Sequence, residues 1–497
     1  MKRRDFYLTT ESDYNDKTEM INPKSASLST PELNNLNIMD NKNNSEQSVS
    51  RKIVAFFAKG PHLSAALSLL LILLIAGCSG PSSENNQDEA NVMIDPDSVV
   101  ITLPEGFSAS VVVDSLGYTR HISVAPNGDI YVKTRGEAGG IAALRDTTDD
   151  FRPDIIEYFS NMTPVRGGVL WETGIKVHNG YIWASNTEAV YRWPIPEDGA
   201  LVPEGDPEIV VSGFPEPQEH ASKTFTFDDN GYIYVSVGAP TNACQERPRN
   251  PGSAGMDPCP QLERQAGIWR FYADSLGQTQ EEGLRYATGV RNVVGLDWNF
   301  DNDALYVAQH GRDQLNVLWP DHFTDEESAE LPSEEIFRLY EGANAGWPYC
   351  YYDWMQEKKV LSPEYGGDGQ TVGRCADYLD PVVAFPGHWA PNALLFYNGE
   401  QFPERYRNGA FVAFHGSWNR APLPQQGYKV VFIPFEEGEL SQEYETFADG
   451  FAGMDPIMNP GAVHRPMGLS IAPDGALYIS DSKMGRIWRV VYTGESN

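Results

Sequence analysis

The feature that most constrains the fold of this chain is a short phrase that recurs six times. Each copy consists of turn residues followed by an alternating strand that carries an aromatic side chain. The first three copies lie about 50 residues apart and the later gaps are longer. The copies are APNGDIYVKT, VHNGYIWASN, DDNGYIYVSV, NFDNDALYVAQ, RYRNGAFVAF and APDGALYISD, with their aromatics at Tyr131, Trp183, Tyr234, Tyr306, Phe411 and Tyr478.

Repeats of this length are typical of four-stranded units that cannot bury their own faces and therefore stack in a ring. We predict an all-β fold, a six-bladed β-propeller over residues 98–494, with inserted loops in the longer gaps. The stretch SASVVVDS, residues 108–115, precedes the first copy, and we expect this strand to complete the last blade. A β-sandwich with shorter repeats, or seven blades with one degenerate copy, are the alternatives.

The N-terminal part of the chain differs in character from the rest. Residues 1–50 are polar and without periodicity, which predicts a disordered or untranslated leader with Met39 as an alternative start. Residues 51–78 combine basic residues with a short apolar run ending in IAGC, which indicates a secretory signal with a lipobox and lipidation of Cys78. A plain membrane-anchor helix is the alternative. Residues 79–97 are polar and predict a flexible tether.

These features together predict an exported protein that is lipid-anchored in the cell envelope, on the periplasmic face or at the outer membrane. Its 37 Lys and Arg against 69 Asp and Glu give a net charge of −32. A chain this acidic repels phosphate backbones, so nucleic acid is excluded as an expected partner.

Four cysteines follow Cys78, an even number that suggests two disulfides in an exported protein. Proximity in the sequence favours the pairs Cys244–Cys259 and Cys350–Cys375. A zinc site is the weaker alternative because no CxxC pair or nearby His–Cys grouping is present.

Polar side chains recur just before or after the repeated phrases, at positions that converge on the channel of a propeller. A histidine beside several arginines would form a cationic cup for a small polyanion, and the neighbouring positive charge would keep the histidine neutral. Taken singly, each residue has an ordinary structural explanation, such as a loop hydrogen bond or a surface ion pair. The candidates are His220, Arg291, Asn292, His310, Gly311, Arg312, Asp313, His415, Ser417, Trp418, Asn419, Arg420, His464 and Arg465.

Several stretches resemble the glucose/sorbosone dehydrogenase family, and its sorbosone and pyranose dehydrogenase branch in particular. They are LPEGFSASVVV, HASKTFTFDDNGYIYVSVG, ATGVRNVVGLDW, GANAGWPYC, APNALLFYNGEQFPERYRNGAFVAFHGSWNR, GYKVVFIPF and HRPMGLSIAPDG. The resemblance covers residues 103–492. It implies a six-bladed propeller that holds pyrroloquinoline quinone with Ca²⁺, and it implies oxidation of an aldose or sugar aldehyde with the quinone as hydride acceptor.

The resemblance also assigns roles to individual residues. EHASKTF matches the stretch of the catalytic histidine, so His220 would be the general base, oriented by Glu219. QHGRD falls where relatives offer two backbone carbonyls to calcium, here those of Gly311 and Arg312. The residues that would contact the cofactor are Arg291, Asn292, His415, Trp418, Arg420 and Arg465.

This chain departs from the family pattern at two places. Met467 stands where soluble glucose enzymes have a second arginine, and the lysine that faces their cofactor has no counterpart here. The electron acceptor would be the quinone pool or a cytochrome. A cell-surface propeller that binds carbohydrate without redox chemistry, through Trp389, Trp418 and Tyr428, is the main alternative. A calcium-dependent lactonase ranks last because arginine and histidine, not acidic residues, recur at the blade ends.

Overall fold

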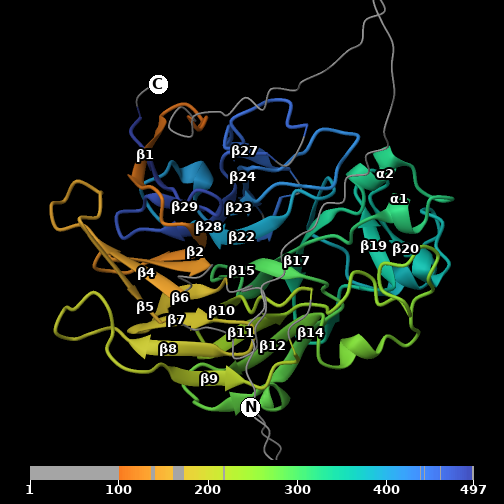
Figure 1. Cartoon of the computed structure of the whole chain (residues 1–497), viewed down its shortest axis with the longest axis horizontal. Coiled ribbons are helices and arrows are strands. Elements are labelled where there is room, and N and C mark those ends of the chain that lie inside the picture. Colours follow the sequence, from red (N-terminus) through yellow and green to blue (C-terminus); the bar gives the residue numbers. More distant parts are fainter. Residues whose placement is uncertain are drawn as a thin grey trace, which may run out of the picture. The chain divides into compact units, whose positions relative to one another are not determined.

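The six repeated phrases form the second strand of six antiparallel sheets arranged around a ring (Figure 1). The computed structural model describes residues 100–494, without 136–139, 161–172, 217–218, 437, 442 and 459–460. The predicted leader, signal segment with Cys78, and tether lie outside these residues. Within them, six sheets have four or five strands each, which confirms the six-bladed β-propeller.

Each blade has a core of four antiparallel strands, with shorter strands interposed in the chain in the third, fourth and fifth blades; the last blade takes β1 from before the first blade. The first blade consists of β2 (Tyr118–Val124), β3 (Ile130–Arg135), β4 (Gly140–Arg145) and β5 (Ile155–Phe159), and the second of β6 (Ile175–His178), β7 (Tyr181–Ser185), β8 (Val190–Pro194) and β9 (Glu208–Ser212). The third blade consists of β10 (Phe225–Phe227), β11 (Tyr232–Val237), β12 (Gly267–Tyr272) and β14 (Leu284–Thr288), and the fourth of β15 (Val293–Asn299), β16 (Ala304–Gln309), β17 (Glu334–Leu339) and β21 (Val383–Phe385). The fifth blade consists of β22 (Pro391–Phe396), β23 (Ala410–Phe414), β24 (Lys429–Ile433) and β27 (Glu445–Ala448), and the sixth of β28 (Pro466–Ile471), β29 (Leu477–Asp481), β30 (Ile487–Tyr492) and β1 (Phe107–Val113).

Short elements decorate the blades and fill the inserted loops. The described helices are α1 (Leu315–Leu318), α2 (Asp325–Glu330), and the single turns η2 (Pro260–Glu263), η3 (Gln280–Glu282), η4 (Pro363–Tyr365), η5 (Gly373–Asp377) and η6 (Glu404–Tyr406). The remaining strands are β13 (Gln278–Thr279), β18 (Ala343–Asn344), the hairpin β19 (Cys350–Asp353) with β20 (Lys358–Leu361), and β25 (Phe435–Glu436) with β26 (Glu439–Leu440). No helix of the described residues is both long enough and apolar enough to cross a membrane.

The repeated aromatic side chain explains why the blades stack. Each of the six is at most 5% exposed and belongs to an apolar cluster that joins its own blade to the next one around the ring. Tyr131 of β3 packs with Ile182 and Trp193 of the second blade, for example, and Tyr478 of β29 packs with Val132 of the first. Burying these rings supplies the contacts that a lone four-stranded unit lacks.

Strand β1 closes the ring, as the sequence predicted. It pairs antiparallel with β30, from Phe107 opposite Tyr492 to Val113 opposite Ile487. The first strands of all six blades line a small cavity in the channel, of about 70 Å³. The ion pair between Lys176 of β6 and Asp297 of β15 lies beside this cavity.

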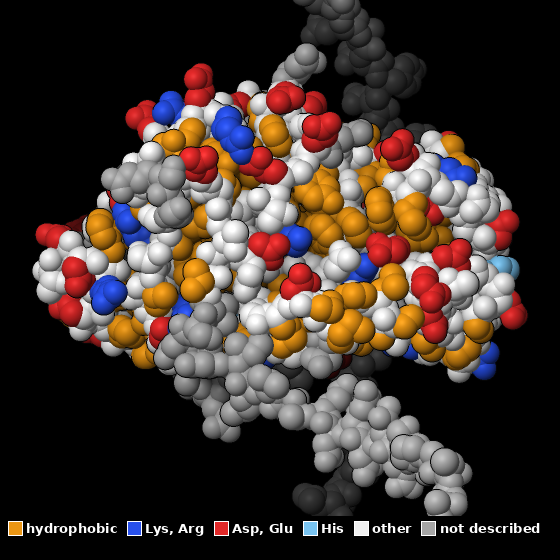
Figure 2. Space-filling model, turned by 90° about the horizontal axis from the view of Figure 1, so that it is seen from above, with side chains coloured by type: hydrophobic (Ala, Val, Ile, Leu, Met, Phe, Trp, Pro, Cys, Tyr) orange, Lys and Arg blue, Asp and Glu red, His pale blue; other side chains and the backbone are white. Residues whose placement is uncertain are grey.

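The longest insertions form a lobe beside the fourth blade, at the position of α1, α2, β19 and β20 in Figure 1. Both predicted disulfides, Cys244–Cys259 and Cys350–Cys375, are confirmed and lie in one buried cluster with Trp347. On the face seen in Figure 2, acidic side chains are scattered among apolar and basic ones.

Candidate active site

A cavity of about 560 Å³ lies where residues from five of the six blades meet. Its lining combines five arginines, four histidines and three carboxyls, which makes its interior cationic although the chain as a whole is acidic. The charged and imidazole side chains are Arg120, Arg135, Arg249, Arg291 and Arg465, His220, His310, His388 and His415, and Glu219, Asp313 and Glu334.

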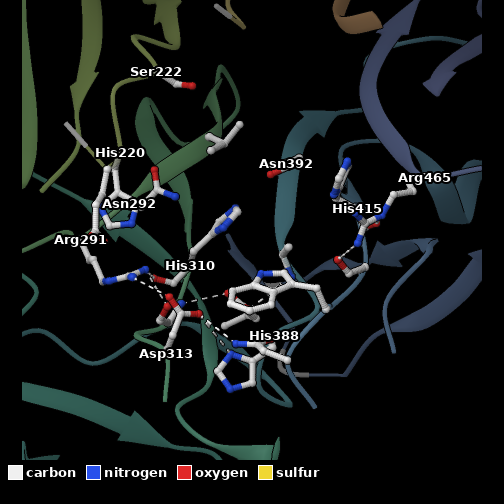
Figure 3. Close-up of a pocket in the computed structure, with 18 of the residues that line it drawn as sticks. His220, Ser222, Arg291, Asn292, His310, Asp313, His388, Asn392, His415 and Arg465 are labelled. Atoms are coloured by element: carbon white, nitrogen blue, oxygen red, sulfur yellow. Dashed lines mark hydrogen bonds and ion pairs between the residues drawn. The ribbon is translucent and has the colours of Figure 1, made fainter. Parts of the chain in front are cut away.

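Seven of the nine residues predicted to act as the base or to bind the cofactor or calcium line this one cavity. They come from segments that precede or follow the repeated strands, as the sequence predicted, and Figure 3 shows two groups on opposite sides of the view. His220, Arg291 and Asn292 lie on one side, and His415 and Arg465 on the other. Gly311 and Trp418 complete the set.

His220 presents a basic nitrogen to the cavity. Its Nδ1 lies 2.7 Å from the carbonyl oxygen of Ala239, so Nδ1 must carry the hydrogen and Nε2 keeps the lone pair. Burial and the nearby Arg291 hold the pKa of His220 well below its usual range. Gly238 makes the close approach possible, because a Cβ there would lie 2.6 Å from the Cβ of His220. His220 is therefore neutral at pH 7, with Nε2 as a hydrogen-bond acceptor.

The expected orientation of His220 by Glu219 is wrong. Both oxygens of Glu219 accept hydrogen bonds from Arg249, at 3.1 and 2.8 Å, and the backbone carbonyl of Ala239 orients the imidazole. Arg249 belongs to the loop stapled by the Cys244–Cys259 disulfide, so this loop brings a guanidinium to the cavity.

Arg291 is held rigidly by a network of acceptors. Its side chain is 3% exposed and donates to the carbonyl of Asn242 at 3.0 Å, to that of Gly311 at 2.7 Å and to Oδ1 of Asn242 at 2.9 Å. Oδ2 of Asp313 lies 3.2 Å away and balances the charge. Burial disfavours the charge on Asp313, but the neighbouring guanidinium groups, that of Arg291 foremost, lower the pKa of Asp313 to about 2.

The other side of the cavity carries the positive charge of Arg120 and Arg465. Arg465 donates to the carbonyls of His415, Gly416 and Ser417, and its guanidinium makes no ion pair with any residue that the structure describes. Arg120, from strand β2, is 8% exposed, and its buried Nε has no hydrogen-bond partner among the described residues. Burial, Arg135 and Arg465 all lower the pKa of Arg120. Such a group calls for an anion, because an unpaired buried charge is costly.

The other two of these nine predicted residues, Arg312 and Arg420, do not line the cavity. Arg420 is fully buried and donates to Glu330 at 2.5 Å and to the carbonyls of Ala329 and Gly387, so it braces loops behind the cavity and does not line it. Arg312 sends its side chain into a buried ion pair with Glu364 at 2.6 Å.

The predicted calcium site is not supported by the residues present. The Gly311 carbonyl already accepts a hydrogen bond from the Arg291 guanidinium, and a cation bound to this carbonyl would be repelled by that charge. Across the part of the chain that the structure describes, no group of three or more His, Cys, Asp or Glu converges as metal ligands.

Sequence reasoning missed several lining residues, among them Arg120, Arg135, Arg249, Glu334, His388 and Asn392. Arg120 had a usable signal, since it precedes the first repeated phrase much as Arg465 precedes the sixth. His388 and Glu334 lie in or beside the long insertions, where the repeat gives no guide.

We expect acid to destabilise the fold. Burial lowers the pKa of His121, His178 and His310 to about 4, while unfolded histidines titrate near 6.5. The unfolded chain therefore binds more protons between these values, and the free energy of unfolding falls as the pH drops from 6.5 towards 4, by up to about 1.4 kcal/mol per pH unit per histidine.

Urea unfolding at pH 7.0, 6.0 and 5.0 measures this effect. Glu334 changes the free energy of unfolding in the opposite direction, because burial raises the pKa of its carboxyl to about 8. Its contribution to stability is lost as the pH rises towards that value. The His310→Asn variant should show a shallower decline at acid pH. An unchanged midpoint from pH 7.0 to 5.0 in the wild-type protein would contradict the assignment of neutral buried histidines.

Fold and cavity together define the chain as a six-bladed β-propeller with a cationic central site. A family model described as TrAA12-like matches residues 101–493, and the chain therefore belongs to this family. The similarity inferred from the sequence motifs is thereby confirmed at the level of the family.

Curated relatives match parts of the chain. A pyrroloquinoline quinone-dependent pyranose dehydrogenase of Coprinopsis cinerea is 30% identical over 275 residues, which cover 48% of this chain and 36% of the relative. An uncharacterized protein of Borreliella burgdorferi is 28% identical over 218 residues, or 43% of this chain and 50% of the relative. The aligned regions thus span half or less of these relatives.

Solved structures share the fold. The holo form of the pyranose dehydrogenase PQQ domain from Coprinopsis cinerea superposes with a TM-score of 0.60 at 20% identity, over 79% of this chain and 97% of that one. The iodide structure of the Trichoderma reesei family AA12 enzyme gives 0.63 at 18% identity, over the same shares. The soluble aldose sugar dehydrogenase of Escherichia coli, in its apo form, gives 0.50 at 17% identity, over 78% and 99%.

Proposed function

We propose that this protein is a quinoprotein oxidoreductase that oxidises an aldose or sugar aldehyde, with pyrroloquinoline quinone as the hydride acceptor. The observation that carries the proposal is the pairing, in one cavity, of a neutral base at His220 with the unbalanced charge of Arg120 and Arg465. Membership of the TrAA12-like family and the similarity to a pyrroloquinoline quinone-dependent pyranose dehydrogenase support it.

The cavity suits this cofactor on chemical grounds. Pyrroloquinoline quinone is a tricarboxylate, and the buried guanidinium of Arg120 lacks the acceptor that a carboxylate would provide. Arg120, Arg135 and Arg465 would hold carboxylates on one side, with His415 beside them and Arg291 and Asn292 facing them. When bound, the quinone supplies the redox chemistry by accepting a hydride from the sugar C–H bond.

The protein's own contribution is positioning and proton transfer. Nε2 of His220 accepts the proton of the sugar hydroxyl, while Nδ1–H stays fixed on the Ala239 carbonyl. Arg291 holds a fixed positive charge next to this base, which keeps it neutral before the reaction.

Other features of the proposal concern the setting of the enzyme. We propose that Cys78 is lipidated, that the protein is tethered at the cell envelope, and that electrons pass to the quinone pool or a cytochrome. Calcium enters no step of the mechanism proposed here.

The non-redox alternative rests on aromatic stacking against sugar. Trp389 and Tyr428 are 6% and 1% exposed, so neither can present a ring face to a ligand. Trp418 lines the cavity and is 57% exposed, and it is the one of the three proposed platforms that a sugar can reach.

Titration of the cofactor-free protein with pyrroloquinoline quinone, followed by absorbance, tests the proposal. We expect saturable micromolar or tighter binding, and then bleaching to the reduced quinone when an aldose is added. Parallel titrations with Ca²⁺ and with a chelator should give the same affinity. Sugar binding by calorimetry without any quinone affinity would contradict the proposed function and favour the carbohydrate-binding module.

A further inference from the structure

A pair of hydrogen-bond acceptors faces the cavity next to the base, and neither the cofactor nor the base accounts for it. The pair consists of Asp313, after strand β16, and His388, before strand β22, which lie side by side in Figure 3. His388 Nδ1 and Asp313 Oδ1 are 4.0 Å apart. A direct hydrogen bond would bring them to about 2.8 Å.

The hydrogen-bond partners of His388 fix its tautomer. Nε2 lies 2.8 Å from the carbonyl oxygen of Ser328, and a carbonyl only accepts, so Nε2 carries the hydrogen. Nδ1 is then a bare acceptor, and burial keeps the imidazole neutral by lowering its pKa. Two acceptors therefore face each other, and none of the residues that the structure describes places a donor between them.

Asp313 can accept a further hydrogen bond on the side that faces His388. Its Oδ2 is taken by Arg291 and Arg249, at 3.2 and 3.5 Å. Its Oδ1 accepts one hydrogen bond from Asn419 at 3.1 Å, which leaves a lone pair for a ligand. The side chain is 18% exposed, whereas that of His388 is 4% exposed.

The backbone of His388 is in a strained conformation. Its φ of +70° is unusual for a residue other than glycine, and such strain persists only where the surroundings enforce it. Arg420 enforces it by donating to the carbonyl of Gly387 at 2.7 Å. Arg420, which does not line the cavity, thus supports the loop that carries His388.

We propose that Asp313 and His388 form a subsite that binds two adjacent hydroxyl groups of the sugar and so determines specificity for substrates with a free vicinal diol. One hydroxyl donates to Oδ1 of Asp313 and its neighbour donates to Nδ1 of His388. Adjacent hydroxyl oxygens on a sugar ring lie about one hydrogen-bond length apart, which suits acceptors separated by 4.0 Å. The subsite deepens the proposed function and rests on it.

Two substitutions of His388 separate ligand binding from structure. Gln places its amide nitrogen near the position of Nε2, so His388→Gln keeps the donor to Ser328 and loses the acceptor. Asn places its amide near Nδ1 and tolerates positive φ, so His388→Asn keeps an acceptor and loses the Ser328 contact. His322→Gln, at an exposed position outside the cavity, is the matched control.

Steady-state kinetics with a panel of aldoses is the main measurement. We expect His388→Gln to raise KM about tenfold with kcat changed less than about threefold, and to leave the affinity for pyrroloquinoline quinone unchanged. His388→Asn should restore KM to within about threefold of wild type. A monodeoxy sugar that lacks a bound hydroxyl should lose affinity for the wild type but not for His388→Gln.

Three results would overturn the subsite. One is an unchanged KM in His388→Gln, and another is an equal rise in both variants, which would indicate a merely structural role. The third is binding of Zn²⁺ or Ca²⁺ by calorimetry that depends on His388. If the wild type binds no quinone, the proposed function fails, and calorimetry with the sugar on wild type and His388→Gln then decides the subsite independently.

Discussion

Replacement of His220 by alanine is expected to lower kcat/KM for sugar oxidation by about 10²- to 10⁴-fold, the usual contribution of a positioned general base. The quinone affinity should stay within about threefold of wild type, because the arginines that face the carboxylates are untouched. Dye reduction under steady-state conditions measures the first quantity, and an absorbance titration measures the second.

The pH profile provides an independent check of the same base. Because burial and Arg291 lower the pKa of His220, the acid limb of kcat/KM should fall well below pH 6.5. His322→Ala, at an exposed position, is the matched control. A His220→Ala protein that retains more than a tenth of the wild-type rate would refute the role of this residue.

Substitution of Arg120 by methionine should have opposite effects on cofactor binding and on stability. Loss of one charge-assisted hydrogen bond should weaken quinone binding about 10- to 100-fold. The cofactor-free protein should gain about 1–3 kcal/mol in the free energy of unfolding, because a buried donor without a partner is removed. Absorbance titration and urea unfolding of the cofactor-free protein measure the two effects.

Arg407→Met, on the exposed surface, serves as the matched control for Arg120→Met. If the Arg120 variant bound the quinone as tightly as wild type, the anion-binding role of this residue would be excluded. A less stable cofactor-free variant would mean that Arg120 has a protein partner in the native state.

The ring architecture was predictable because its cause is local and repeated. Each aromatic such as Tyr131 or Tyr478 sits at the same place in its blade and fills the seam to the next blade, so its period is visible in the sequence. The disulfides were predictable because each pair closes a short loop. The closure by β1 followed from an extra strand before the first repeat.

The cavity was only partly predictable, and the reason lies in where its residues come from. His220, Arg291 and Arg465 precede repeated strands, so the repeat located them. Arg420 follows β23 in the same manner, yet its side chain turns away because Glu330 of helix α2 and the carbonyl of Gly387 are its partners. The repeat cannot predict these hydrogen-bond partners, because they belong to insertions that lie outside the repeated phrases.

The insertions also account for what was missed. His388 and Glu334 frame the lobe of α1, α2, β19 and β20, whose length follows no period. The backbone orientation of His220 by Ala239 was not predictable either, because a carbonyl acceptor leaves no trace in the side-chain sequence. The sequence suggested orientation by the adjacent Glu219, but the Glu219 carboxylate forms an ion pair with Arg249 from a separate loop.

The pairing of β1 with β30 bears on the timing of cofactor loading. The two strands come from opposite ends of the described propeller, so this contact is the most non-local one in the ring and the last that synthesis makes possible. Strand β2 with Arg120 also packs against β28, which follows Arg465, so the two arginines meet at the seam that β1 and β30 close. If the proposed quinone binds at this seam, a closed ring is required for its uptake, and the amount of bound quinone would measure how many molecules have closed.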